Sequence, residues 1–100
     1  MKVVLSKESK ADLLEIKEFI KTNSPKRAQA FTEKLLDRCA ALVDMPYAFP
    51  IIPRYEQHQI RRVVHENYLI FYRVKNQRIE VIRILHGARD FDALLFPNPE

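Results

Sequence analysis

Two short polar turns divide the second half of the chain into three strand-like segments. Residues 60–65, 68–74 and 78–85 are rich in β-branched and aromatic residues, and the turns between them contain Asn67 and Asn76. Two-residue loops of this kind favour asparagine, which tolerates positive φ, and they join neighbouring antiparallel strands. The spacing therefore predicts an antiparallel three-stranded meander, which leaves few choices for the rest of the fold.

The first half of the chain shows the periodicity of two helices. Apolar residues recur at helical spacing within residues 13–20 and again within 28–43. Ser24 followed by Pro25 is a typical helix start, because serine caps a helix and proline is tolerated at its first position. Only a few residues join the two helices, so we expect an antiparallel helix hairpin.

A short strand at residues 2–5 and a proline-rich loop at 45–53 complete the predicted order of elements. The chain has 100 residues, which suits one compact domain, so we expect residues 1–100 to form a single domain. The predicted fold class is α+β. Its order is β-α-α-β-β-β, with the helix hairpin packed on one face of a mainly antiparallel sheet.

The register of the strands decides which side chains share a face of the sheet. With two-residue loops at both turns, Ile70 lies opposite Val63 and Arg83. Phe71 then lies opposite Ile82. One face is expected beneath the helix hairpin and holds Ile60, Val64, Leu69, Phe71, Ile82 and Ile84. The other face is expected to be open and holds Arg61, Val63, His65, Tyr68, Ile70, Tyr72, Val81 and Arg83.

Arg83 is the residue that favours an open face. An arginine within an apolar face is costly unless it is paired or hydrated. We therefore interpret the second face as a basic, partly apolar groove for a partner peptide, or for phosphates with bases stacked on tyrosines. The alternative is that Arg83 pairs with an acid such as Glu80 or Asp90 and only stabilises the turn.

The composition excludes several kinds of chemistry. A single glycine rules out a glycine-rich phosphate loop, and Cys39 alone allows neither an intrachain disulfide nor a cysteine metal cluster. No histidine pair or acidic cluster has metal-ligand spacing, so we expect no metal and no cofactor. A lone cysteine suits the reducing cytoplasm, and no apolar stretch approaches the roughly 20 residues that span a bilayer. The net charge of +4 suits an acidic protein partner or a polyanion.

His86, near Arg83 and Arg89, is the candidate for catalysis. A histidine could transfer protons in RNA cleavage while arginines stabilise the charge on the phosphate. A single histidine at the end of a strand is more often a hydrogen-bonded turn residue.

The chain resembles the ParE toxins of the RelE/ParE superfamily, the toxin halves of bacterial type II toxin–antitoxin modules. The similarity rests on four segments in the same order: "LSKESKADLLEIKEFI" at 5–20, "SPKRAQAFTEKLL" at 24–36, "IRRVVHENYLIFYRV" at 60–74 and "IEVIRILHGARDFDALL" at 79–95. The resemblance implies the β-α-α-β-β-β fold. It also implies a protein partner, a ParD-like antitoxin whose acidic, partly disordered C-terminal segment wraps the toxin.

The resemblance further implies a target. ParE toxins block DNA gyrase and so stall replication, whereas RelE toxins cut mRNA in the ribosome. RelE-type cleavage uses basic residues and usually a tyrosine near the C-terminus, and the tail "GARDFDALLFPNPE" has no tyrosine and no lysine. Gyrase inhibition is therefore the main prediction. The alternative is a ribosome-dependent endoribonuclease with Arg61, Arg83 and His86 as catalytic residues, and a third reading is a non-toxic regulator.

Two sets of binding residues follow from these predictions. The residues expected to bind the target are Arg61, Arg62, Arg83, His86, Arg89, Phe91, Leu94, Leu95 and Phe96. The residues expected to bind the antitoxin are Leu14, Ile70, Tyr72, Val81, Arg61 and Arg83. A direct contact with nucleic acid is expected only for the nuclease alternative, and no membrane partner is expected.

Overall fold

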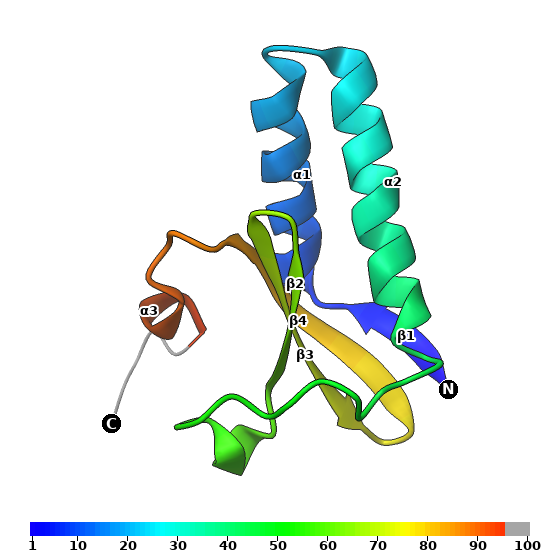
Figure 1. Cartoon of the computed structure of the whole chain (residues 1–100), viewed down its shortest axis with the longest axis vertical. Coiled ribbons are helices and arrows are strands. Elements are labelled where there is room, and N and C mark those ends of the chain that lie inside the picture. Colours follow the sequence, from blue (N-terminus) through cyan, green and yellow to red (C-terminus); the bar gives the residue numbers. More distant parts are fainter. Residues whose placement is uncertain (96–100) are drawn as a thin grey trace.

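The computed structural model describes residues 1–95 and shows one four-stranded sheet with a helix hairpin beside it (Figure 1). The elements in chain order are β1 (Lys2–Leu5), α1 (Lys7–Lys21), α2 (Pro25–Ala41), the 3-10 turn η1 (Glu56–His58), β2 (Arg61–His65), β3 (Tyr68–Lys75), β4 (Arg78–His86) and α3 (Phe91–Leu95). The strand order is β1-β4-β3-β2, with β1 parallel to β4 and the other pairs antiparallel. This arrangement confirms the predicted α+β fold, to which η1 and α3 are additions.

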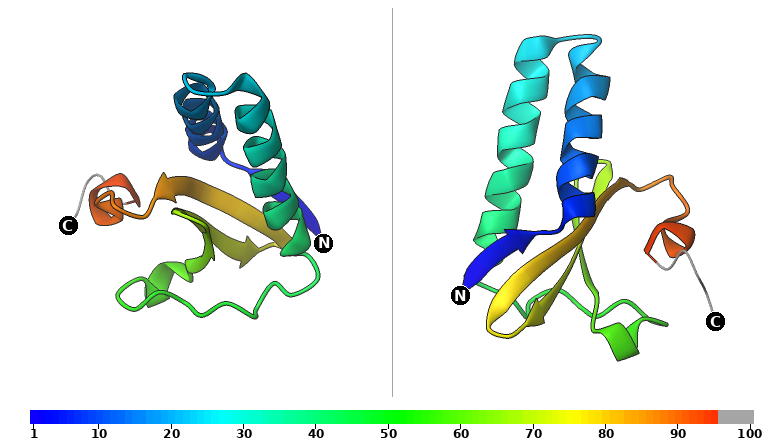
Figure 2. Two further views of the ribbon diagram at one scale, coloured as in Figure 1. Left: turned by 45° about the horizontal axis from the view of Figure 1, so that its top comes forward. Right: turned by 180° about the vertical axis from the view of Figure 1, so that it is seen from behind.

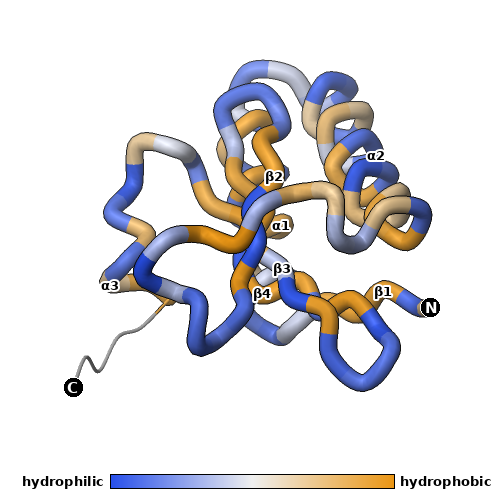
Figure 3. The backbone as a smooth tube through the Cα atoms, turned by 60° about the horizontal axis from the view of Figure 1, so that its bottom comes forward, coloured by the Kyte–Doolittle hydropathy of each residue, from blue (hydrophilic) through white to orange (hydrophobic). Residues whose placement is uncertain are grey.

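Most of the local signals in the sequence act as predicted, but in the turn between β2 and β3 the positive φ falls on Glu66 and not on Asn67. Ser24 caps α2 by accepting a hydrogen bond from the backbone N–H of Arg27, and Pro25 occupies the first turn. In the turn between β3 and β4, Asn76 and Gln77 both have positive φ, as a type I′ turn requires. Along the backbone, hydrophilic residues gather at this turn and apolar residues in the strands (Figure 3).

The sheet is covered on both faces, by different parts of the chain. In Figure 2 the helix hairpin lies on one side of the sheet and the loop that precedes β2 lies on the other. The cluster on the hairpin side contains Leu13, Ile16, Ile20, Ala28, Leu35, Cys39, Leu42, Val63, Ile70, Tyr72, Ile79, Val81 and Ile84. The cluster on the loop side contains Ile52, Tyr55, Ile60, Phe71 and Leu85, with residues of α3 packed against it.

The predicted assignment of the faces is therefore wrong. The hairpin covers the face that holds Val63, Ile70, Tyr72 and Val81, which we expected to be open, and each of these side chains is fully or almost fully buried. Alternation of apolar residues defines two faces of a sheet but does not say which of them the helices cover. In this chain both faces are apolar enough to be covered.

A bulge also changes the predicted register of β3 and β4. The pairs nearest the turn are as predicted, with Arg73 opposite Glu80 and Tyr72 opposite Val81. The register shifts between Phe71 and Tyr72, so that Phe71 pairs with Arg83, and the predicted pairs Phe71–Ile82 and Ile70–Arg83 are wrong. One extra residue on β4 reverses the alternation beyond it.

No helix among residues 1–95 is both long enough and apolar enough to span a membrane.

Candidate functional site

Arg83 is bound inside the protein, to a partner that the sequence did not indicate. Its Nε and Nη2 atoms donate to the Oδ2 and Oδ1 atoms of Asp12 on α1, at 2.8 and 2.9 Å. The Arg83 and Asp12 side chains are 17% and 7% exposed. These hydrogen bonds raise the pKa of Arg83, against the opposing effect of burial. Arg83 is therefore paired, as the alternative interpretation held, but with Asp12 and not with Glu80 or Asp90.

The same pair joins three elements of the fold. The Oδ2 atom of Asp12 also accepts a hydrogen bond from the backbone N–H of Ile84, at 2.9 Å. Arg83 uses its Nη1 atom to donate to the backbone carbonyl of Leu94 in α3, at 3.2 Å. The carboxylate and the guanidinium thus connect α1, β4 and α3, and the expectation that Arg83 lies in an open groove is wrong.

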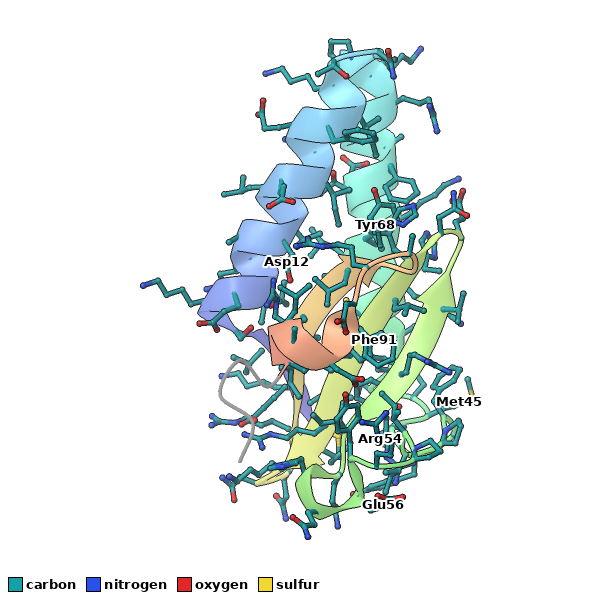
Figure 4. All side chains as sticks on the ribbon, turned by 90° about the vertical axis from the view of Figure 1, so that its left-hand side faces the viewer. Asp12, Met45, Arg54, Glu56, Tyr68 and Phe91 are labelled. Carbon is teal, nitrogen blue, oxygen red and sulfur yellow. The ribbon has the colours of Figure 1, made fainter. Side chains whose placement is uncertain are left out.

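A surface cleft lies between α1 and the ends of β3 and β4. It has a volume of about 300 Å³ and is lined by Asp12, Glu15, Ile16, Phe19, Tyr68, Ile84, His86 and Arg89. Figure 4 shows Asp12 and Tyr68 on the side of the molecule that also carries Phe91 of α3. The cleft has apolar groups from α1 and β4, and two predicted site residues, His86 and Arg89, stand at its edge.

The polar groups of the cleft contact each other. The Nη1 atom of Arg89 lies 3.6 Å from the Oε1 atom of Glu15, across the space between the turn after β4 and α1. Burial, and the nearby charge of Glu15, raise the pKa of the Tyr68 hydroxyl. The Tyr68 and His86 rings meet edge to face with centroids 5.3 Å apart. His86 accepts a hydrogen bond at Nδ1 from the backbone N–H of Ala88, so it is a hydrogen-bonded turn residue that also lines the cleft.

Arg61 lies away from the cleft and holds the loop that precedes η1. Its Nη1 atom donates to the carbonyl oxygens of Phe49, at 2.5 Å, and Tyr47, at 3.4 Å. Its guanidinium stacks over the Tyr47 ring, 5.2 Å from the centroid. Arg62 is exposed.

The three residues of the predicted nuclease do not share a site. Arg61 pairs with Tyr72 in the sheet, whereas His86 pairs with Tyr68, four residues earlier on β3. At about 3.4 Å per residue, these positions are separated by roughly 14 Å along the strand. Arg83 is engaged by Asp12, so among these three residues only His86 lines the cleft.

The segment after β4 carries the remaining predicted residues. Phe91 packs on Phe71 and Tyr55, with ring centroids 5.2 and 6.5 Å apart. Leu94 and Leu95 are half-buried against the same cluster. Phe96 lies outside the described residues.

The residues that were predicted to bind the antitoxin differ in their exposure. Ile70, Tyr72 and Val81 are covered by the hairpin, so they do not form the exposed docking surface that we expected. Leu14 is exposed on α1 but does not line the cleft.

Three important residues of α1 were missed by the sequence reasoning. Asp12 was not predicted as a site residue, although it falls among the buried positions of the helix. A carboxylate on a buried stripe needs a partner, and that signal could have indicated an arginine. Glu15 carried no such signal, because it occupies an ordinary exposed position on the helix. Phe19 belongs to the apolar repeat within residues 13–20, which predicts a buried side chain, whereas Phe19 is 68% exposed. Within residues 1–95, no three histidine, cysteine or acidic side chains are grouped as metal ligands.

Comparisons with known proteins show a shared fold and then the family. A solved structure from the chromosomal ParDE TA system of P. aeruginosa has the same fold, with a TM-score of 0.70 and 20% sequence identity, over 86% of this chain and 95% of that chain. The family model for the ParE toxin of type II toxin-antitoxin system, parDE, matches residues 3–91. The chain therefore belongs to the ParE toxin family. No curated protein sequence matches it.

Proposed function

We propose that this toxin inhibits DNA gyrase in the cytoplasm, as a single-domain binding protein, and that a ParD-like antitoxin neutralises it. The observation that carries the proposal is the match of the ParE family model to residues 3–91. The solved structure with the same fold comes from a toxin–antitoxin system, which supports a protein partner for this chain. The net charge of +4 suits an acidic partner.

The target-binding surface in this proposal is the segment from His86 to Leu95. His86 and Arg89 are exposed, and Phe91, Leu94 and Leu95 are half-buried beside them. An exposed arginine next to aromatic and apolar side chains is typical of surfaces that bind proteins. Arg62, which is exposed on β2, and Phe96, outside the described residues, stay predictions as target-binding residues.

Arg83 and Arg61 have an indirect role in this proposal. Arg83 positions α3 through the carbonyl of Leu94, and Arg61 holds the loop through the carbonyls of Tyr47 and Phe49. Their replacement would therefore disturb binding by loosening these segments.

The test uses the purified toxin with two targets in parallel. It is added to gyrase with relaxed plasmid, and to translating ribosomes with labelled mRNA. Loss of supercoiling or accumulation of cleaved plasmid, with intact mRNA, is the expected result. Cleaved mRNA with unaffected gyrase would contradict the proposal and favour the nuclease alternative, which the separation of Arg61 from His86 does not support.

Two variants locate the surface. Replacing both His86 and Arg89 by alanine should weaken gyrase inhibition at least about tenfold, since a few central residues carry most of the energy of an interface. Lys34→Ala on the exposed side of α2 is the matched control and should leave inhibition unchanged. Equal inhibition by all three proteins would place the target surface elsewhere.

A further inference from the structure

The cleft between α1 and the turn after β4 has a partly apolar lining and a charged edge. Ile16 and Ile84 are buried side chains that line it, and the Phe19 side chain stands at the edge with 68% of its surface exposed. The volume of about 300 Å³ is at the lower end of the range of small-molecule pockets. The cleft therefore suits one large apolar side chain of a protein better than a cofactor.

The charges of the cleft differ in how firmly they are held. Asp12 is neutralised by Arg83 in a buried bidentate pair, so it offers no free negative charge to a ligand. The pair of Arg89 with Glu15 is longer, at 3.6 Å, and its side chains are 43% and 76% exposed. Exposed pairs of this kind contribute little and exchange partners easily. Arg89 is therefore available to a carboxylate from outside.

We propose that this cleft takes an apolar side chain from an acidic segment of the antitoxin, while a carboxylate of that segment replaces Glu15 as the partner of Arg89. The inference rests on the proposed function, because it assumes that an antitoxin exists. It names the contact that the antitoxin makes. The occupant carries a carboxylate because Arg89 is held only by one long, exposed contact with Glu15, which an outside carboxylate can replace. It carries an apolar side chain because Ile16, Ile84 and Phe19 would surround one.

This contact also accounts for neutralisation. His86 and Arg89 belong both to the cleft and to the segment that we propose for the target. An antitoxin segment bound in the cleft would cover them, so the toxin could not hold both partners by the same residues.

The experiment measures the affinity of the full toxin for the ParD-like antitoxin of the proposed function. Phe19→Ala and Arg89→Glu should each weaken binding at least about tenfold, as expected for central contacts of an interface. The matched controls are Leu36→Ala, an exposed leucine on α2, and Lys34→Glu, an exposed charge reversal on α2. Both controls should bind like the unmodified toxin. Phe19 and Arg89 are exposed enough for the variants to fold, which circular dichroism would verify.

A charge-reversal scan identifies the carboxylate. Each acidic residue of the antitoxin segment is changed in turn to lysine and tested against the Arg89→Glu toxin. One such change should restore at least part of the lost affinity and should weaken binding to the unmodified toxin. Failure of every lysine variant to restore binding would overturn the ion-pair part of the proposal.

Two outcomes separate this inference from the proposed function. Unchanged affinity for Phe19→Ala and Arg89→Glu, with tight binding by the unmodified toxin, would overturn the cleft proposal and leave the toxin–antitoxin proposal standing. No binding by any toxin would count against the proposed function itself.

Discussion

Two arginine–carboxylate pairs lie one turn apart along α1, and they differ in almost every physical respect. The inner pair, Arg83 with Asp12, is bidentate and buried. The outer pair, Arg89 with Glu15, has one long contact and is open to solvent. Burial decides the role of each arginine: the inner one holds the fold together, and the outer one is available to a partner. The presence of an arginine in a sequence motif does not by itself mark a binding residue.

Removing the acid of the inner pair should have the largest effect on stability. Asp12→Ala leaves a buried guanidinium and the N–H of Ile84 without their acceptor, which should lower the free energy of unfolding by about 3–5 kcal/mol. Urea unfolding followed by circular dichroism measures it. Glu15→Ala is the matched control on the same helix and should change it by less than about 1 kcal/mol. If both variants lowered the free energy of unfolding by the same amount, the inner and outer pairs would contribute equally to stability.

Replacing the inner pair by apolar residues should recover most of that loss. The double variant Asp12→Leu with Arg83→Met removes both charges together, and such replacements of buried pairs are often neutral or stabilising. We expect its free energy of unfolding to lie within about 2 kcal/mol of the unmodified protein. A double variant as unstable as Asp12→Ala would show that the links to Ile84 and Leu94 matter more than the buried charge.

A third arginine–carboxylate pair, with exposure between those of the inner and outer pairs, predicts how the stability of the protein depends on pH. Arg73 donates to Glu80 at 2.8 Å, with side chains 34% and 22% exposed. This hydrogen bond lowers the pKa of Glu80 below its usual value. A carboxylate with a lowered pKa in the folded state stabilises the protein above its unfolded pKa, and that contribution disappears as the pH falls through the folded value.

Glu80→Gln should therefore flatten the loss of stability in acid. The melting temperature of the variant should fall less steeply than that of the unmodified protein as the pH drops from about 5 toward 3, because one depressed carboxylate is absent. Thermal unfolding at several pH values measures the slope. Parallel curves for the two proteins would indicate that the Arg73–Glu80 pair is formed equally in the unfolded chain.

The smallest effect on stability is expected at the outer pair. Arg89→Ala should change the free energy of unfolding by no more than about 0.5 kcal/mol, as for most surface substitutions. The same variant should reduce the salt dependence of the association rate with the antitoxin, since exposed charges are screened within about 8 Å at physiological ionic strength. If the association rate falls with salt equally for the Arg89→Ala variant and the unmodified toxin, Arg89 does not contribute to the electrostatic attraction between toxin and antitoxin.

Much of the fold could be predicted from local signals. Ser24 with Pro25 starts α2, and Asn76 in the turn between β3 and β4 has the positive φ that asparagine tolerates. The sheet faces could not be assigned, because both faces are apolar and the bulge between Phe71 and Tyr72 reverses the alternation of β4. A bulge has no reliable signature in a sequence of β-branched residues, so the position of Arg83 required the structure.

The candidate site was predicted only in part. His86 and Arg89 were identified from the motif at the end of β4, and the structure places both at the cleft. The other side of the cleft is formed by α1, which lies far from β4 in the sequence. Asp12 and Arg83, for example, are separated by 71 residues. Neighbours so distant in sequence are set by the packing of α1 against β4, which a periodicity of apolar residues does not specify.

Because β1 is short, it pairs with only part of β4, and the rest of that edge must be protected from other molecules in another way. β1 ends at Leu5, and beyond it the polar backbone of β4 is occupied by side chains: the Ser6 hydroxyl donates to the carbonyl of Ile82, and Asp12 accepts from the N–H of Ile84. A sheet margin with its donors and acceptors already engaged is a poor template for a strand from another molecule. The start of α1 thus also protects this rim of the sheet against domain swapping and amyloid-like stacking.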